Sequence, residues 1–193
     1  MLAKKLSNYN LILASKSPRR QQFFKDLNLP FTVQTKEVEE IYPTELQGPQ
    51  ITDYLADLKS KPFTNSLKEN DLLITSDTIV WLENEALGKP TNEPDAIAIL
   101  QKLSGKKHQV ITSVSIKSKH FQKIINDTTN VYFKELTLDE IIFYIQSCQP
   151  FDKAGSYGIQ EWIGFIGIDK IEGSYFNVMG LPVHKLYKEL MQL

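Results

Sequence analysis

Arg19 and Arg20 stand where a predicted strand leads into a predicted helix. The apolar run Leu11–Ala14 is typical of a buried strand, and Ser17 followed by Pro18 is typical of an N-cap and first helical residue. The N–H groups at a helix N-terminus attract phosphate, and arginine binds phosphate oxygens through paired donors. The pattern therefore predicts an anion site, although an ordinary capped helix with exposed arginines would look the same.

Asp77 is a second candidate, because with Thr78 it follows the apolar run Leu72–Ser76. That run predicts a buried strand ending at Ser76, and the ligands of α/β sheets gather beyond the carboxyl ends of strands. A carboxylate there can bind magnesium or accept a proton from an attacking water. An aspartate after a strand is also a common turn former, so residue chemistry alone leaves both roles open.

Three lysines are candidates to bind a triphosphate. Lys59 lies on a helix predicted over residues 52–63, Lys89 lies between Gly88 and Pro90, and Lys153 precedes Ala154-Gly155. Most single lysines are solvated surface charges. Lys89 and Lys153 are less typical, because each lies beside rigid turn residues after an apolar segment.

Two further polar positions have weaker patterns. Glu40, in an acidic stretch, is typical of a solvated loop, with metal binding as the alternative. Gln160 follows Gly158 in a glycine-rich turn, where its amide either contacts a base edge or bonds the backbone. The three histidines share no ligand spacing, and no Walker A, GxGxxG or nucleophile-elbow motif is present. Residue chemistry therefore indicates a small-anion or nucleotide site and no more.

The bulk composition is that of an ordinary globular domain, with 193 residues of which 41% are hydrophobic. The formal net charge of −1 argues against polymeric nucleic acid as a partner. Cys148 is the only cysteine, so no intramolecular disulfide is possible. The apolar runs are too short to span a bilayer and no signal peptide is expected, so we expect a cytoplasmic protein without a membrane partner.

Hydrophobic patterns predict the elements that must position these residues. Strands and helices alternate early, and the runs 109–116 and 121–133 predict β-ribbons in the middle of the chain. Residues 79–82 and 86–87 flank Asn84-Glu85 and predict a hairpin. We therefore expect a mixed α/β sheet with helices packed around it.

Three helices and one glycine-rich segment complete the pattern. Residues 92–103 predict a helix, and Thr137 with Glu140 forms a capping box that begins a helix ending at Cys148. Pro182 begins a final amphipathic helix. The segment 155–180, rich in glycine, aromatic and β-branched residues, predicts strands and tight turns.

Six segments, in order, resemble the Maf family of nucleoside triphosphate pyrophosphatases. They are Leu13–Arg20, Ser76–Val80, Gly88–Pro90, Leu103–Gly105 with His108–Val110 and Thr112, Asp152–Gln160, and Gly173–Pro182. The resemblance covers nearly the whole chain and implies a single Maf-like domain over residues 1–193. It implies a mixed twisted sheet in two lobes with a nucleotide cleft between the lobes, often in a homodimer.

The resemblance also implies roles by position. Asp77 corresponds to the proposed catalytic base, and Glu40 with Asp77 corresponds to a site for a divalent cation, Mg²⁺ or Mn²⁺. Contacts to a nucleoside triphosphate are implied for Ser15, Arg19, Arg20, Lys59, Thr78, Lys89, Lys153 and Gln160. The implied reaction is hydrolysis to the nucleoside monophosphate and pyrophosphate.

Within this family the chain resembles the branch that acts on dTTP and UTP, in which Arg19, Thr78 and Gln160 are associated with specificity. Two alternatives remain: the same chemistry on 7-methyl-GTP or another purine nucleotide, and a nucleotide-sensing regulator of cell division or septum formation. The presence of Asp77, the residue that corresponds to the catalytic base, favours an enzyme over a sensor.

Three positions depart from the family pattern: Lys16, Pro62 and the pair Glu161-Trp162. The first two leave the assignment intact. The third replaces small residues directly after Gln160 and can reshape the base pocket.

Overall fold

The computed structural model describes residues 1–193 and divides into two compact units, each built from separate stretches of the chain. Unit 1 comprises Met1–Asp77, Thr112–Asp127 and Gly180–Leu193, and unit 2 comprises Thr78–Ile111 and Thr128–Met179. Strands β3 (Asp71–Leu82), β5 (Lys107–Lys117) and β6 (Gln122–Phe133) contribute residues to both. The strand order is β2-β1-β3-β5-β6-β7, with β4 paired to β3. The expected mixed α/β fold is confirmed.

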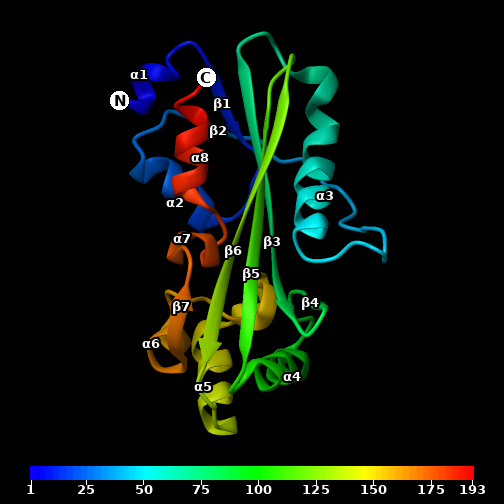
Figure 1. The fold of residues 1–193 in the computed structure, drawn as a ribbon, viewed down its shortest axis with the longest axis vertical. Coiled ribbons are helices and arrows are strands. Elements are labelled where there is room, and N and C mark those ends of the chain that lie inside the picture. Colours follow the sequence, from blue (N-terminus) through cyan, green and yellow to red (C-terminus); the bar gives the residue numbers. More distant parts are fainter. The chain divides into compact units, whose positions relative to one another are not determined.

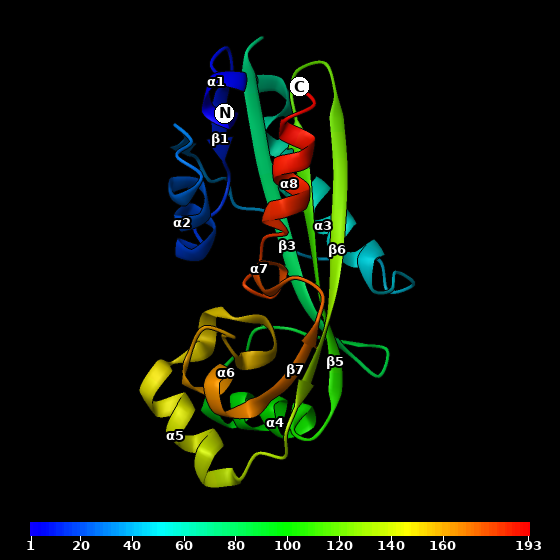
Figure 2. The same cartoon turned by 60° about the vertical axis from the view of Figure 1, so that its left-hand side comes forward.

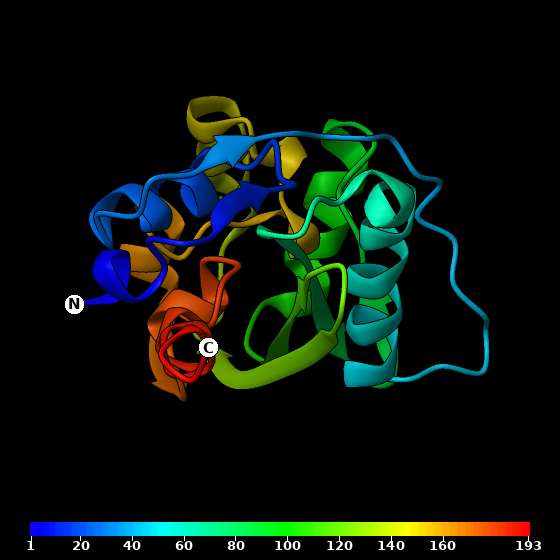
Figure 3. The same cartoon turned by 90° about the horizontal axis from the view of Figure 1, so that it is seen from above.

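Unit 1 contains α1 (Leu2–Lys5), β1 (Asn10–Leu13), α2 (Pro18–Asp26), β2 (Thr32–Val33), α3 (Pro49–Ser60), the 3-10 helix η1 (Lys61–Ser66) and α8 (Val183–Leu190). β1 lies between β2 and β3 and is parallel to both. α3 lies on one side of these strands and α8 on the other (Figures 1 and 2). The view from above places α2 on the same side as α8 (Figure 3).

Buried hydroxyl groups fix α3 against the strands of unit 1. Oγ1 of Thr75 on β3 donates to the carbonyl oxygen of Ala56 at 2.6 Å. On β5, the hydroxyl of Ser113 lies 2.6 Å from that of Thr52 and donates to the carboxylate of Asp53 at 2.6 Å. These bonds are buried or partly buried, so breaking one would leave an unsatisfied polar group, and together they fix the first two turns of α3 against the strands.

Unit 2 contains β4 (Glu85–Leu87), α4 (Glu93–Leu103), α5 (Leu138–Cys148), α6 (Trp162–Gly167), β7 (Ile168–Glu172) and α7 (Tyr175–Val178), with 3-10 helices η2 (Pro150–Asp152) and η3 (Ala154–Ser156). α4 contacts both α5 and η3, and α5 contacts α6, which leads directly into β7 (Figure 2). β7 pairs antiparallel with β6.

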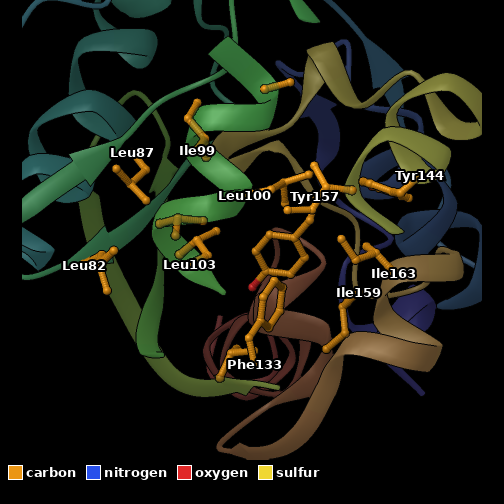
Figure 4. Packing of buried hydrophobic residues seen from close by; sticks show 14 of the residues in the cluster. Leu82, Leu87, Ile99, Leu100, Leu103, Phe133, Tyr144, Tyr157, Ile159 and Ile163 are labelled. Carbon is orange, nitrogen blue, oxygen red and sulfur yellow. The ribbon is translucent and has the colours of Figure 1, made fainter. Parts of the chain in front are cut away.

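The core of unit 2 combines aliphatic side chains of α4 with aromatic side chains (Figure 4). Tyr157 packs edge-on against Phe133, with ring centroids 4.9 Å apart, and His108 contacts both rings. Tyr144 of α5 and Ile163 of α6 are fully buried in the same cluster. This core supports the segment 157–160.

The predicted strand end at Ser76 is wrong, because β3 continues to Leu82. Asp77 and Thr78 therefore lie inside a twelve-residue strand rather than after it. Ser76, Asp77 and Thr78 are polar and interrupt the apolar pattern of the strand. The charge of Asp77 is nevertheless compensated by the ammonium of Lys59, and the strand does not end there. The predicted hairpin follows, with Glu83 and Asn84 in its turn at φ 49° and 67°.

The prediction of strands and tight turns over 155–180 is largely wrong. This segment forms η3, α6 and α7, and only β7 is a strand. Gly164 explains part of the difference, because a Cβ there would lie 1.9 Å from the carbonyl oxygen of Ile159. The glycine allows close packing of a short helix, and such packing overrides the β-propensity of the neighbouring residues.

The remaining helix predictions are confirmed. α4, α5 and α8 lie within a residue or two of the expected bounds, and Thr137 and Glu140 form the capping box. α3 starts earlier than expected, at Pro49, and η1 follows it from Lys61. None of the helices has the length and apolar character that crossing a membrane requires.

Candidate active site

The start of α2 has the capped geometry that its sequence predicts. Oγ of Ser17 accepts from the backbone N–H of Arg20 at 3.4 Å, and Oγ of Ser15 accepts from the N–H of Ser17 at 3.2 Å. The side-chain amide of Gln21 donates to the carbonyl oxygen of Ser15 at 3.1 Å. The segment from Ser15 to the first turn of α2 is therefore a defined turn that presents Arg19 beside it.

Arg20 joins three distant segments of unit 1. Its Nε donates to the carbonyl oxygen of Gly180 at 2.8 Å, and its Nη1 donates to that of Ser76 at 3.0 Å. Burial lowers the pKa of the Arg20 guanidinium, and the nearby carboxylate of Asp77 opposes that shift. Arginine remains protonated in proteins, so Arg20 places a fixed positive charge beside Asp77.

Asp77 is buried, with 6% of its surface exposed, and forms an ion pair with Lys59 of α3. Nζ of Lys59 lies 2.5 Å from Oδ1 of Asp77 and 3.1 Å from Oε1 of Glu40. A buried carboxylate requires such a partner, because an unpaired charge in the interior costs several kcal/mol, roughly 3–5. Three residues that were separate candidates in the sequence thus form one cluster.

Glu40 and Asp77 meet the chemical requirement for a divalent cation site. Both carboxylates already contact one cation, the ammonium of Lys59. No group of three or more His, Cys, Asp or Glu side chains gathers as a complete metal site. Magnesium is commonly bound by one or two carboxylates together with water and substrate phosphate, so a two-carboxylate site fits a metal that arrives with a nucleotide.

The other expected residues lie in unit 2, where two of their loops are joined. The N–H of Gly155 donates to the carbonyl oxygen of Gly88 at 3.0 Å, which brings the loops of Lys89 and Lys153 side by side. Gly155 has φ 69°, and a Cβ there would lie 2.6 Å from Cγ2 of Val80. Only glycine meets both conditions, so it fixes the position of the loop.

Lys153 and Lys89 differ sharply in exposure. Lys89 is exposed, whereas Lys153 has only 8% of its surface exposed. Nζ of Lys153 lies 2.6 Å from Oδ1 of Asp152 and 3.0 Å from Oε1 of Glu161. Thr78 and Gln160 are half-buried in the same unit. The structure therefore divides the expected residues into two sets, with Thr78, Lys89, Lys153 and Gln160 in unit 2 and the others in unit 1.

The sequence profile described as Maf-like protein matches residues 10–193. The chain belongs to the Maf-like family. A relative from Flavobacterium psychrophilum is 59% identical over 191 residues, covering 99% of this chain and 98% of the relative. A relative from Christiangramia forsetii is 55% identical over 193 residues, covering 100% of this chain and 98% of the relative. Both relatives are named dTTP/UTP pyrophosphatase.

Solved structures place this Maf-like chain in a known fold class. The Ham1 protein of Staphylococcus aureus matches with a TM-score of 0.53 and 17% identity, covering 95% of this chain and 98% of that protein. A HAM1 protein from Coxiella burnetii gives 0.52 and 16%, covering 96% and 100%. At these identities the likeness shows the fold alone.

One residue beside the candidate residues of unit 2, Tyr144, was not expected from the sequence of this Maf-like chain, whereas Glu161 was noted because it follows Gln160. Tyr144 lies in the apolar stripe of α5 and looks like an ordinary core residue, but its hydroxyl bonds Glu161 and the backbone of Gly158. The only sequence signal was Glu161, which departs from the family pattern at that position. Spacing along the chain does not reveal that Glu161 also contacts Lys153.

Proposed function

We propose that this protein is a nucleoside triphosphate pyrophosphatase that hydrolyses dTTP and UTP to the monophosphate and pyrophosphate. The observation that carries the proposal is the buried carboxylate of Asp77 beside Lys59 and Arg20. Relatives between 50% and 59% identical are named dTTP/UTP pyrophosphatase, which supports the substrate class.

In the proposed reaction, water attacks the α-phosphorus and the bond from that phosphorus to the bridging oxygen breaks, releasing pyrophosphate. Asp77 accepts the proton of the attacking water. Arg19 and Lys59 neutralise the charge of the phosphate oxygens, and this neutralisation is the main source of catalysis in phosphoryl transfer. Arg20 holds the backbone around Asp77 and adds positive potential, and Ser15 lines the phosphate loop.

Glu40 and Asp77 are the proposed ligands of a divalent cation, Mg²⁺ or Mn²⁺. When bound, such a cation screens phosphate charge and lowers the pKa of coordinated water. The two carboxylates currently share the ammonium of Lys59, and this shared contact supports their ability to hold a cation together. The family resemblance implies the metal dependence and a homodimer, and we propose a cytoplasmic location.

The residues of unit 2 are proposed as further substrate contacts. Lys89 and Lys153 supply positive charge for phosphate oxygens, while Thr78 and Gln160 contribute to the choice of base. The joined loops at Gly88 and Gly155 support a common role for the two lysines.

Hydrolysis in ¹⁸O-labelled water tests the function. The panel contains dTTP, UTP, CTP, GTP and 7-methyl-GTP with Mg²⁺, and dTTP and UTP should give the fastest release of pyrophosphate. The label should appear in the monophosphate, because water attacks the α-phosphorus. Nucleoside diphosphate with free orthophosphate would contradict the mechanism. Excess chelator should abolish turnover, and full activity in chelator would remove the metal from the proposal.

A further inference from the structure

Lys153 is almost completely buried, and its ammonium forms ion pairs with two carboxylates that differ in their exposure to solvent. The side chain of Asp152 is 56% exposed, whereas that of Glu161 is only 20% exposed. An ion pair with an exposed partner is weakened by water, so Glu161 is the partner that determines where the ammonium lies.

Glu161 extends this contact toward the backbone of the turn at Gly158. Its Oε1 forms an ion pair with Nζ of Lys153, while its Oε2 accepts from the hydroxyl of Tyr144. The oxygen of that hydroxyl accepts from the N–H of Gly158 at 3.0 Å. The groups form a continuous chain from a buried cation to a backbone amide, and bonds in such chains strengthen one another.

The side-chain amide of Gln160 also lies close to Gly158. A Cβ at Gly158 would lie 2.7 Å from Cδ of Glu161 and 3.0 Å from Nε2 of Gln160. The Glu161 carboxylate and the Gln160 amide therefore share the space left by the absent side chain of Gly158. A movement of Glu161 would change the position of the Gln160 amide.

A second bond holds the other end of this turn. The hydroxyl of Tyr157 lies 2.7 Å from Nε2 of His108 on β5, and both side chains are buried. Figure 4 shows Tyr144, Tyr157 and Ile159 together in the core of unit 2. With Tyr157 held by His108 and Ile159 packed in the core, the turn at Gly158 is further held by the hydroxyl of Tyr144 and by the backbone N–H of Glu161, which donates to the carbonyl oxygen of Gly158 at 3.0 Å.

We propose that Tyr144 and Glu161 form a positioning pair that sets the nucleotide preference of this enzyme by holding Lys153 and the Gln160 amide in one arrangement. Neither residue needs to contact the nucleotide. The inference rests on the proposed function, since it concerns the preference of that same reaction.

Variants Tyr144→Phe, Glu161→Gln and their double combination test the pair. Unit 2 offers a matched control on its surface, where Glu172 accepts from Tyr132 at 2.7 Å and from Lys170 at 2.6 Å. Tyr132→Phe and Glu172→Gln remove the same chemical groups from an exposed site. The readouts are kcat and KM for dTTP, UTP, CTP and GTP, and the amide NMR shifts of Gly158 and Gln160 without nucleotide.

Each site variant should narrow the dTTP-to-GTP ratio of kcat/KM by about tenfold, mainly through KM, while both control variants keep it. The double variant should narrow it no further, because residues that act as a pair are not additive. The NMR shifts of Gly158 and Gln160 should move in both site variants. If Tyr144→Phe does not fold, Glu161→Gln alone decides.

An unchanged dTTP-to-GTP ratio of kcat/KM in site variants that fold and remain active would overturn the inference and leave the function intact. Unmoved amide shifts of Gly158 and Gln160 in those variants would also overturn it. Failure of the unmodified protein to release pyrophosphate from dTTP or UTP would instead overturn the proposed function, and the inference with it.

Discussion

The ammonium of Lys59 lies 2.5 Å from Oδ1 of Asp77, in the middle of strand β3 rather than at its end. Lys59 comes from the last turn of α3, which is fixed to the strands by the bond from Thr75 to Ala56. The two charges are therefore held by rigid elements and not by mobile loops. Such positioning favours a role in catalysis, because a reacting group must be held accurately.

Asp77→Asn should lower kcat by roughly 100- to 10,000-fold, as expected when a general base is lost. The amide has the same shape, so the circular dichroism spectrum should not change. Asp71→Asn is the matched control, because Asp71 lies on the same strand, is equally buried, and bonds only Asn10 and the backbone of Lys68. The control should lose stability but keep its turnover. Near-normal turnover in Asp77→Asn would reduce Asp77 to a structural residue.

Arg19 and Arg20 should have separable roles. Arg20→Lys removes the guanidinium, whose Nε and Nη1 donate to the carbonyl oxygens of Gly180 and Ser76. The free energy of unfolding should therefore fall by about 1.5–3 kcal/mol. Although the family resemblance associates Arg19 with specificity, Arg19→Ala should instead raise KM for every triphosphate to a similar degree, because the proposed contact of Arg19 is with phosphate oxygens, which carry no base information. Urea unfolding and steady-state kinetics measure the two effects. A base-selective change in Arg19→Ala would contradict this division.

Gln160→Ala should lower kcat/KM for dTTP and UTP, with a loss of transition-state stabilisation of about 1–3 kcal/mol. The ratios of kcat/KM for dTTP and UTP relative to CTP and GTP should become smaller. A uracil or thymine edge has two carbonyl acceptors around one N–H donor, and a glutamine amide matches part of that pattern. Gln149→Ala, a change outside the glycine-rich turn, serves as the control. Unchanged ratios of kcat/KM for dTTP and UTP relative to CTP and GTP in Gln160→Ala would remove this residue from base selection.

His108 should make the stability of the protein depend on pH. Burial lowers the pKa of His108 to about 3, whereas in the unfolded chain it is about 6.5. Between these values the unfolded state binds the additional proton, so the stability is complete above pH 6.5 and falls as the pH is lowered toward 3. From pH 7 to pH 5 the free energy of unfolding should fall by about 2 kcal/mol more than in His108→Gln. Urea titrations at both pH values measure this, and equal falls would contradict it.

The sequence predicted most of the helices because their ends have strong local signals. Ser17 with Pro18, Asn92, and Thr137 with Glu140 each cap a helix by a bond to a residue three positions away. Such contacts are local, so the residue order contains them. The grouping of Ser15, Arg19, Asp77 and Lys153 as one set of candidates came from the family resemblance.

The errors occurred where distant residues determine the local structure. Asp77 stays within β3 because neighbouring strands pair with β3, and Lys59 from another element compensates the buried charge of Asp77; no spacing within β3 indicates either contact. Gly164 allows a helix because Ile159 packs against it. Proteins break local rules most often at functional positions, and the buried charge of Asp77 inside β3 agrees with the role proposed for Asp77.

Unit 1 is built from three separate stretches of the chain, so its contacts become possible at different times during synthesis. The ion pair between Lys59 and Asp77 joins residues 18 positions apart and involves only the first stretch of the chain. The bond from Arg20 to Gly180 spans 160 positions and cannot form until the last stretch has been made. Contacts of such large separation slow folding, because the chain must close a long loop before they contribute. The nascent chain therefore contains both Lys59 and Asp77 long before Gly180 and α8 have been made.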